Sequence, residues 1–229
     1  MNSLVQLAET ALVRHRLVRV ARDAWETCVA SRADLCDEPL VRDWGARGWP
    51  LVVRRMGPCD AWGASVPLGL PLPPSAGKRR IGVTVPADAI ESVEPPPTLA
   101  SLRNIAPVKW HTTIDALDAV ARRHGVSCHA FGSLAWQGLT GLRYLSDESD
   151  LDILFDLPTA SDVSVALAAL LADVAACDAV APMRIDGEVI RIDGAGVNWR
   201  ELHAGVDDVV VKTASNVVLA SPRAFVEGV

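Results

Sequence analysis

The chain has 229 residues, of which 50% are hydrophobic and 22% are charged, with a formal net charge of -6 and a pI near 5.3. This composition is typical of a soluble globular protein with an ample core and excludes a disordered chain. The acidic balance argues against non-specific binding to nucleic acid. A phosphate-bearing ligand would therefore need locally placed Arg, Lys or a metal ion.

The sequence lacks the usual signs of secretion, membrane insertion or a structural zinc site. The first ten residues have no basic segment of the kind that opens a signal peptide. No uninterrupted apolar run approaches the length of a membrane span. The cysteines show neither a CxxC pair nor a Cys/His cluster, which is typical of reduced thiols; they are Cys28, Cys36, Cys59, Cys128 and Cys177. We expect a cytoplasmic protein with no membrane or nucleic-acid partner.

The N-terminal part is predicted to be a small, mainly β domain, residues 1–94. Residues 49–55 and 80–85 are rich in β-branched residues and predict strands, and the Pro- and Gly-rich segment 57–77 separates them. Consecutive prolines then follow at residues 95–97, where neither a helix nor a central strand can continue. We therefore expect a linker there and a second domain over residues 98–229.

The second domain alternates helical and strand patterns. A helix is predicted from an N-cap at Thr113 to a stop at Gly125, followed by a strand at 126–131 and a short helix at 134–139. A strand at 151–157 and a helix at 161–177 come next. Short strands are predicted at 183–186, 188–192, 209–212 and 217–219. This order predicts an α+β fold in which helices flank one mixed sheet.

Two carboxylates stand in the strand at 151–157 and its approach. Because alternate residues of a strand share a face, Leu151, Ile153 and Phe155 point to the core while Asp150 and Asp152 point together the other way. Two neighbouring carboxylates repel each other unless a cation lies between them, and oxygen ligands favour magnesium or manganese. The simpler alternative is that both aspartates are ordinary solvent-exposed side chains of an edge strand.

The turn before the short helix adds a second element of a phosphate site. Gly132 and Ser133 offer backbone N–H groups and a hydroxyl at a helix start. Gly132-Ser133 followed by Ser149-Asp150-Leu151-Asp152-Ile153 resembles the signature of the nucleotidyltransferase superfamily related to DNA polymerase β. The resemblance implies a nucleotidyltransferase-type sheet, with the Gly-Ser turn on a triphosphate and Asp150 and Asp152 as metal ligands.

In that superfamily a third carboxylate comes from a neighbouring strand. Asp186, on the first strand after the long helix, is in the matching place and is our choice, with Glu188 as the alternative. The dipeptide Asp186-Gly187 is also typical of a tight hairpin turn, which would make Asp186 a turn residue instead.

A closer resemblance covers most of the chain. The segments GSLAWQGLTGLRYLSDESDLDILFD, RIDGEVIRIDGAGVNWREL, VVVKT, PLVVRR and GKRRIGVTVP resemble the phosphoribosyl-dephospho-coenzyme A transferases of malonate decarboxylase. The resemblance implies transfer of a prosthetic group from 2'-(5''-triphosphoribosyl)-3'-dephospho-CoA to a serine of the apo acyl-carrier subunit of malonate decarboxylase, with release of diphosphate. The alternatives are the equivalent citrate lyase enzyme, a nucleotidyltransferase that uses ATP or another NTP, and a non-catalytic nucleotide-binding domain.

These roles can be placed on particular residues. Asp150, Asp152 and Asp186 are the expected catalytic carboxylates, the first two holding Mg²⁺ or Mn²⁺. Gly132 and Ser133 are expected on the departing phosphates. Lys78, Arg79 and Arg80, which follow Gly77, form the densest basic cluster and are expected to contact substrate or carrier, although a solvated strand edge would have the same composition. Lys212, within Val-Val-Val-Lys-Thr, is the remaining substrate-binding candidate, against ordinary outward alternation.

Overall fold

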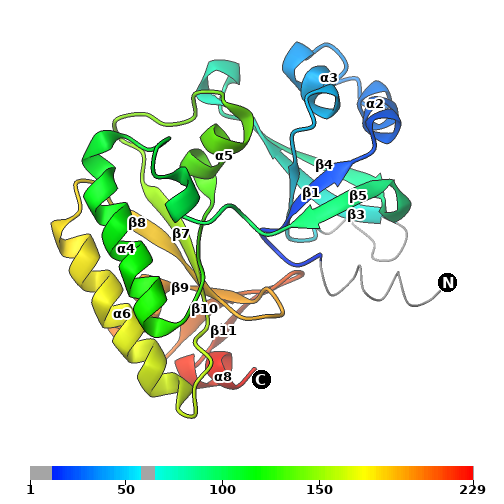
Figure 1. Cartoon of the computed structure of the whole chain (residues 1–229). Helices are drawn as coiled ribbons and strands as arrows, with labels where there is room; N and C mark the ends of the chain where they lie inside the picture. Colours follow the sequence, from blue (N-terminus) through cyan, green and yellow to red (C-terminus); the bar gives the residue numbers. More distant parts are fainter. Residues whose placement is uncertain (1–11, 58–64, 229) are drawn as a thin grey trace. The chain divides into compact units, whose positions relative to one another are not determined.

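The computed structural model describes residues 12–57 and 65–228, and the chain divides after Pro95 into two compact units (Figure 1). Cys59 and the segment examined for a signal peptide lie outside the described residues. Each unit has its own sheet.

The described part of the first unit holds an antiparallel five-stranded sheet in the order β4-β3-β2-β1-β5. Its strands are β1 (Leu17–Val20), β2 (Leu51–Val53), β3 (Ser65–Pro71), β4 (Arg80–Pro86) and β5 (Ile90–Glu94), and its helices are α2 (Arg22–Ala30), α3 (Pro39–Ala46) and the short 3-10 turns η1 (Pro74–Ala76) and η2 (Ala87–Ala89). Trp25 and Trp44 fill its core, and their indole N–H groups donate to the carbonyls of Val41 and Pro50. The mainly β character expected of this part is confirmed.

Strand β3 lies within the segment that the sequence analysis took for a separator. It pairs with β4 over its whole length, from Ser65 opposite Pro86 to Pro71 opposite Arg80. On its other side β2 pairs only with Leu68 and Gly69. Pro67 and Pro71 therefore lie outside the pairing with β2, so their lack of an N–H removes no bond from that ladder. The prolines made this segment look like a loop in the sequence, although they do not prevent it from forming a strand.

The second unit holds a mixed six-stranded sheet in the order β11-β10-β9-β8-β7-β6 within the described residues. Only β7 and β8 run parallel. The strands are β6 (Cys128–Ala130), β7 (Leu151–Asp156), β8 (Ile185–Ile190), β9 (Gly196–Asn198), β10 (Val209–Lys212) and β11 (Val217–Ala220). The helices are η3 (Ala100–Leu102), η4 (Val108–Trp110), α4 (His111–His124), α5 (Gly132–Thr140), α6 (Val163–Val180), α7 (Trp199–Ala204) and α8 (Pro222–Glu227). The α+β class and the mixed sheet flanked by helices are confirmed.

Helices α4 and α6 lie side by side on one face of this sheet (Figure 1). Leu151, Ile153 and Phe155 are fully buried in the core cluster that these helices share with the sheet, as the alternation predicted. Helix α4 begins earlier than expected, because the 3-10 turn η4 leads directly into it at His111. Thr113 is therefore a buried residue of the first turn and not the N-cap. Gly125 ends the helix in a left-handed conformation, as predicted.

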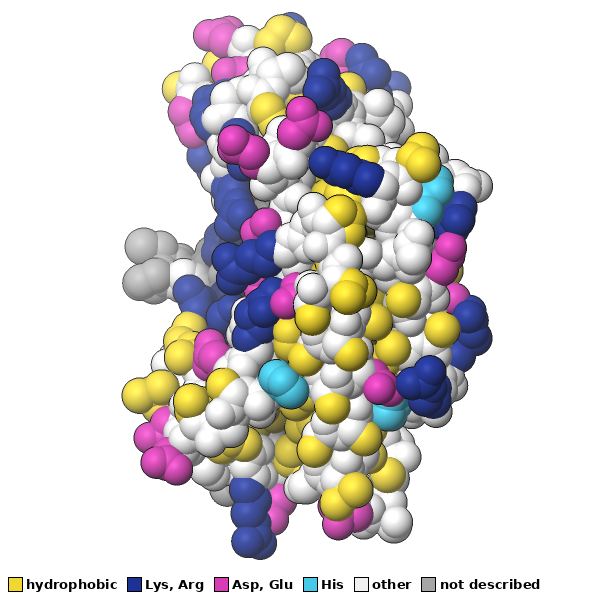
Figure 2. All heavy atoms as spheres, turned by 90° about the vertical axis from the view of Figure 1, so that its left-hand side faces the viewer, with side chains coloured by type: hydrophobic (Ala, Val, Ile, Leu, Met, Phe, Trp, Pro, Cys, Tyr) yellow, Lys and Arg dark blue, Asp and Glu magenta, His cyan; other side chains and the backbone are white. Residues whose placement is uncertain are grey.

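The periodicity of the sequence predicts a buried stripe on helix α6 at Val163, Ala166, Leu167, Leu170, Leu171 and Val174, and the last four are buried in the structure while the first two are half-buried. Asp162 caps the first turn of α6 by accepting from the N–H of Val165. By length and composition it is apolar enough to cross a membrane, so the expectation that no segment approaches a span does not hold for it. Its leucine stripe packs within the core of this unit. Figure 2 shows hydrophobic side chains spread over this side of the molecule. Val165 and Val180 of α6 are among the exposed large hydrophobic residues.

Strand β8 runs straight through Asp186-Gly187, where a hairpin turn between two strands had been an open interpretation. Parallel pairing with β7 on one side and antiparallel pairing with β9 on the other keep the chain extended there. A Cβ atom on Gly187 would lie 1.9 Å from the carbonyl oxygen of Ile153. Glycine at this position therefore permits close approach of two strands and makes no turn. Strand β9 and helices α7 and α8 were not predicted.

Candidate active site

The Gly132 turn brings a helix start against a strand carboxylate. Phe131, the residue between β6 and α5, donates its N–H to the carbonyl of Asp152 at 3.1 Å. Gly132 then has φ +62°, and a Cβ atom there would lie 1.9 Å from Oδ2 of Asp152. The carboxylate of Asp152 thus occupies the space that a side chain at position 132 would need. Glycine is required here for both its conformation and its lack of a Cβ.

The first turn of α5 suits an anion. Its N-cap residue, Phe131, supplies no side-chain hydrogen bond, so the first N–H groups of the helix are not capped by it. Ser133 is the second residue of this helix and is half-buried. The positive end of the helix dipole lies next to the carboxylate of Asp152. A phosphate group could share this end with Asp152 only if a cation lay between the two negative charges.

Asp186 lies directly opposite Asp152 on the neighbouring parallel strand. Paired residues of adjacent strands point to the same face and are about 5 Å apart. This face is the one opposite to Leu151, Ile153 and Phe155. Asp152 and Asp186 are both half-buried. The sequence analysis placed the two residues on neighbouring strands, and the structure sets them in register.

Asp150 stands one residue before β7 and is half-buried. The loop that leads to it closes on itself, because the N–H of Ser146 donates to Oγ of Ser149 at 2.9 Å and the N–H of Ser149 donates to the carbonyl of Ser146 at 3.2 Å. The first residue of β7, Leu151, is fixed by donation to the carbonyl of Arg184. Asp150 is therefore positioned between an ordered turn and a strand end.

The carboxylate of Asp186 is held through one oxygen. Its Oδ1 accepts from the N–H of Gly187 at 2.8 Å and from Nδ2 of Asn198 at 2.9 Å. Its Oδ2 lies 3.8 Å from a guanidinium nitrogen of exposed Arg184. Asn198 was not among the predicted site residues, since nothing in a single sequence marks the last residue of a three-residue strand as a partner of an aspartate twelve positions earlier.

Glu188 and Lys212 form an ion pair on the same face. Lys212 pairs with Gly196 of β9, whose missing side chain lets the lysine extend across that strand. Its Nζ donates to Oε1 of Glu188 at 2.7 Å. Glu188 is 5% exposed, whereas 36% of the lysine side chain remains exposed. Lys212 thus faces the carboxylate side of the sheet, with its charge partly neutralised by the alternative third carboxylate.

The predicted basic cluster belongs to the first unit. Lys78, Arg79 and Arg80 are exposed at the tip of the connection from β3 to β4. Gly77 and Lys78 both adopt positive φ there, which turns the chain sharply into β4. Arg79 pairs with Glu38, next to α3.

The carboxylates do not already form a complete metal cage. Among residues 12–57 and 65–228 no group of three or more His, Cys, Asp or Glu side chains stands at metal-binding spacing. Mg²⁺ is commonly held by one or two carboxylates together with substrate phosphates and water. The paired aspartates fit that pattern, since they offer carboxylate oxygens as ligands, and the N–H groups of the adjacent helix start could hold the substrate phosphates.

Cysteine chemistry has no place in this site. The four described cysteines are free thiols. Burial raises the pKa of the thiols of Cys28, Cys128 and Cys177. A raised pKa leaves less of the nucleophilic thiolate at neutral pH. Transfer through any of these three thiols is therefore disfavoured.

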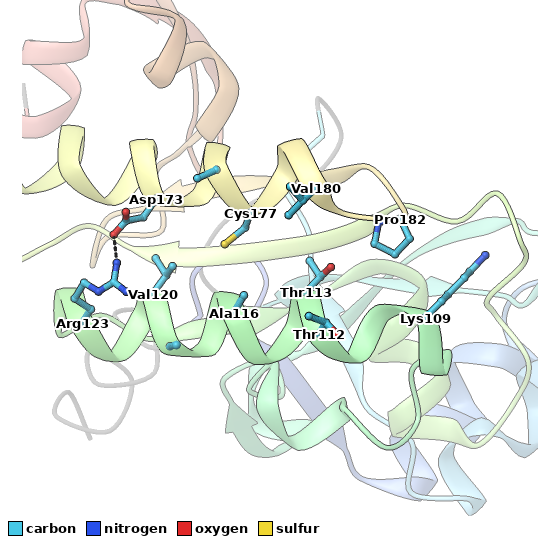
Figure 3. Close-up of a pocket in the computed structure, with 12 residues that line it drawn as sticks. Lys109, Thr112, Thr113, Ala116, Val120, Arg123, Asp173, Cys177, Val180 and Pro182 are labelled. Carbon is cyan, nitrogen blue, oxygen red and sulfur yellow. Dashed lines mark hydrogen bonds and ion pairs between the residues drawn. The ribbon is translucent and has the colours of Figure 1, made fainter.

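A groove on the other side of the sheet carries no comparable constellation. It has a volume of about 680 Å³ and lies along α4 and α6, with Lys109 and Pro182 at one end and the Arg123–Asp173 ion pair at the other (Figure 3). Its floor is made of small apolar residues such as Ala116 and Val120. A smaller hollow of about 400 Å³ adjoins α5 and the loop through Arg143 and Ser146.

Comparison with known proteins places the chain in a family. Residues 13–96 match the N-terminal domain, and residues 98–223 the C-terminal domain, of the family described as phosphoribosyl-dephospho-CoA transferase MdcG. A phosphoribosyl-dephospho-CoA transferase of Bradyrhizobium diazoefficiens is 45% identical over 94% of this chain and 92% of its own length. Another, of Xanthomonas euvesicatoria pv. vesicatoria, is 38% identical over 92% and 94%. No solved structure matches the chain.

The protein is thus a transferase enzyme with an α+β fold in two units. It belongs to the phosphoribosyl-dephospho-CoA transferase family, as both family domains and the relatives agree, and the resemblance seen in the sequence is confirmed.

Proposed function

We propose that this enzyme transfers the 2'-(5''-phosphoribosyl)-3'-dephospho-CoA group to a serine of the apo acyl-carrier subunit of malonate decarboxylase. The donor is 2'-(5''-triphosphoribosyl)-3'-dephospho-CoA and the second product is diphosphate. The observation that carries the chemistry is the contact of Asp152 with Gly132 at the start of α5, with Asp186 directly opposite. It joins a phosphate-binding helix start to two carboxylates on one face of a sheet.

The proposed reaction is a displacement at the α-phosphorus of the donor. The serine oxygen of the carrier forms the new P–O bond. The bond from the α-phosphorus to the oxygen that bridges to the β-phosphorus breaks, and the β- and γ-phosphates leave with that oxygen as diphosphate. The serine proton is lost to solvent or to a site carboxylate. Because such a reaction depends on positioning and charge neutralisation, residues that hold phosphates are decisive.

The proposal assigns these tasks to residues on the carboxylate face. Gly132, Ser133 and the N–H groups of α5 hold the departing phosphates. Asp150 and Asp152 would hold Mg²⁺ or Mn²⁺, with Asp186 as the third carboxylate, and such an ion would supply charge neutralisation for the leaving diphosphate. Lys212, and Lys78, Arg79 and Arg80 of the first unit, contact the phosphates of the donor or the acidic surface of the carrier. The free thiols of the described cysteines support the cytoplasm as the compartment.

The decisive variant is Asp152→Asn. With the triphosphoribosyl donor, Mg²⁺ and the apo carrier, the wild-type enzyme should increase the carrier mass by that of the prosthetic group and release diphosphate. Asp152→Asn should slow this transfer by about 100-fold or more, because loss of a metal ligand removes several kcal/mol of charge stabilisation. Mass spectrometry of the carrier and a diphosphate assay measure the two products.

Asp156→Asn is the matched control. Asp156 ends the same strand on the same face, pairs with Ile190 and is half-buried, so this variant removes a carboxylate of the same charge away from the site. It should transfer at the wild-type rate. An equally active Asp152→Asn enzyme would refute the site, and modification of the citrate lyase carrier alone would reassign the acceptor. Reaction with ATP and no carrier modification would indicate an ordinary nucleotidyltransferase.

A further inference from the structure

The side chain of Asn198 donates a hydrogen bond to the carboxylate of Asp186. We infer that it is a positioning residue for that carboxylate, an inference that rests on the proposed function. The observations that carry it are the two hydrogen bonds that its amide group makes at once: Nδ2 donates to Oδ1 of Asp186 at 2.9 Å, and Oδ1 accepts from the N–H of Arg200 at 2.9 Å.

The orientation of the amide is fixed by these partners. An ionised carboxylate can only accept, and a backbone N–H can only donate, so the nitrogen of Asn198 must face Asp186 and its oxygen must face Arg200. The register supports the same geometry. Asn198 lies opposite Glu188, two residues beyond Asp186 on β8, which places Asp186 at the diagonal position on the same face.

The oxygen of Asn198 also starts a helix. It is the N-cap of α7, and the first residues of that helix are tied back to β8. The indole N–H of Trp199 donates to the carbonyl of Ile185 at 3.3 Å, and the guanidinium of Arg200 donates to the same carbonyl and to Oδ1 of Asp178. Asn198 is therefore held between a fixed helix start and the carboxylate next to Ile185.

A capping role alone does not explain asparagine here. Serine, threonine and aspartate cap helices as well as asparagine does, since capping needs only an oxygen acceptor. Aspartate has no donor, and serine or threonine would have to serve both partners from one short hydroxyl, whereas asparagine reaches them with two separate atoms, Oδ1 for the N–H of Arg200 and Nδ2 for Asp186. With Oδ1 of Asp186 engaged by Asn198 and by the N–H of Gly187, Oδ2, which lies 3.8 Å from a guanidinium nitrogen of exposed Arg184, is the oxygen that a cation shared with Asp152 would contact.

The test separates capping from positioning by comparing Asn198→Ser with Asn198→Ala. Serine keeps a capping oxygen but loses the amide nitrogen that reaches Asp186, and its hydroxyl is one bond shorter, whereas alanine loses both groups. Asn198→Ser should melt at nearly the wild-type temperature but bind Mn²⁺ about 10- to 100-fold more weakly, measured by calorimetry without substrate, and its kcat should fall by a similar factor at unchanged KM. Asn198→Ala should show the same weakening of Mn²⁺ binding together with a lower melting temperature.

Ser221→Ala supplies the control for capping. Ser221 caps α8 by accepting from the N–H of Ala224 and touches none of the carboxylates of the site. This variant should lower the melting temperature and leave Mn²⁺ affinity unchanged. Wild-type Mn²⁺ affinity and kcat in Asn198→Ser would overturn the inference. If Asn198→Ser behaved like the wild type while Asp152→Asn were inactive, the proposed function would stand and only the role of Asn198 would fall. A fully active Asp152→Asn would instead refute the proposed metal site.

Discussion

Gly132 and Asp152 are in direct contact, and each restricts what the other position can hold. The aspartate lies where any larger residue would place its Cβ, and the glycine conformation aims the start of α5 at that carboxylate. Each residue alone is unremarkable in sequence, because glycine turns and strand aspartates are both common. They are separated by nineteen residues in the sequence, and the fold brings them into contact to form the candidate site.

Gly132→Ala is expected to cost both stability and activity. Alanine at φ +62° costs about 1–2 kcal/mol of unfolding free energy. Its Cβ must also displace the carboxylate of Asp152, so transfer should be nearly abolished. Gly125→Ala provides the comparison, since Gly125 has φ +63° and no atom within 4 Å of the added Cβ. Urea denaturation and carrier modification measure the two effects.

The comparison isolates the contact from the backbone strain. Gly125→Ala should lose a similar free energy from strain and keep wild-type transfer. Full transfer by Gly132→Ala would show that the carboxylate of Asp152 has no fixed place in catalysis.

Strand alternation in the sequence was enough to predict which face of the sheet individual residues occupy. Alternation placed Leu151, Ile153 and Phe155 in the core and Asp152 on the opposite face. It did not predict Asn198, because the hydrogen bond to Asp186 depends on how β9 pairs with β8. Register between strands is set by packing of the whole sheet, and a local pattern does not contain it.

Helices and strands whose pattern lies within their own segment were predicted, and those that depend on pairing with distant strands were not. Helix α6 was predicted because its buried stripe repeats within the segment itself. Strand β3 was missed because Pro67 and Gly69 outweigh its apolar residues until β4 pairs with it. The possible turn at Asp186-Gly187 became a continuous strand because β7 and β9 pair with β8 on both sides. Tertiary pairing overrides the local preference in both strands.

The ion pair of Lys212 with Glu188 links β10 to β8 across β9. Lys212→Met should destabilise the protein by about 1–3 kcal/mol, because it removes a partner of a carboxylate that is 5% exposed. Glu188→Gln should cost less, since an amide oxygen can still accept from the lysine. The double variant should recover part of the loss of Lys212→Met. Urea denaturation of all four proteins gives the coupling free energy.

The same four proteins separate structure from substrate contact. If Lys212 holds donor phosphates, Lys212→Met should raise KM or lower kcat under conditions where it is fully folded, and Glu188→Gln should not. Equal transfer by folded Lys212→Met and wild type would restrict the lysine to its structural role.

At the scale of the whole molecule, the two units are built as separate sheets with separate cores. Their division after Pro95 falls within the run of prolines, which cannot extend β5 further. The core cluster of the second unit contains Trp110, Phe155, Trp199 and Phe225, all almost fully buried. All the proposed carboxylates lie in this unit, whereas Lys78, Arg79 and Arg80 lie in the first. In the proposed function, the metal site would thus belong to the second unit and the cluster of Lys78, Arg79 and Arg80 to the first.

A fragment of residues 96–229 should therefore fold alone and bind Mn²⁺ with nearly the affinity of the full chain, yet transfer the prosthetic group poorly. Its own core and sheet predict one cooperative thermal transition, and its carboxylate site is complete without the first unit. Calorimetry measures both the unfolding and the Mn²⁺ affinity.

In the full chain, a triple variant that combines Lys78→Gln, Arg79→Gln and Arg80→Gln should reproduce the loss of transfer as a raised KM. Neutral side chains no longer attract the phosphates or an acidic carrier. An unfolded fragment would contradict the independence of the unit, and an unchanged KM in the triple variant would remove the basic cluster from the binding surface.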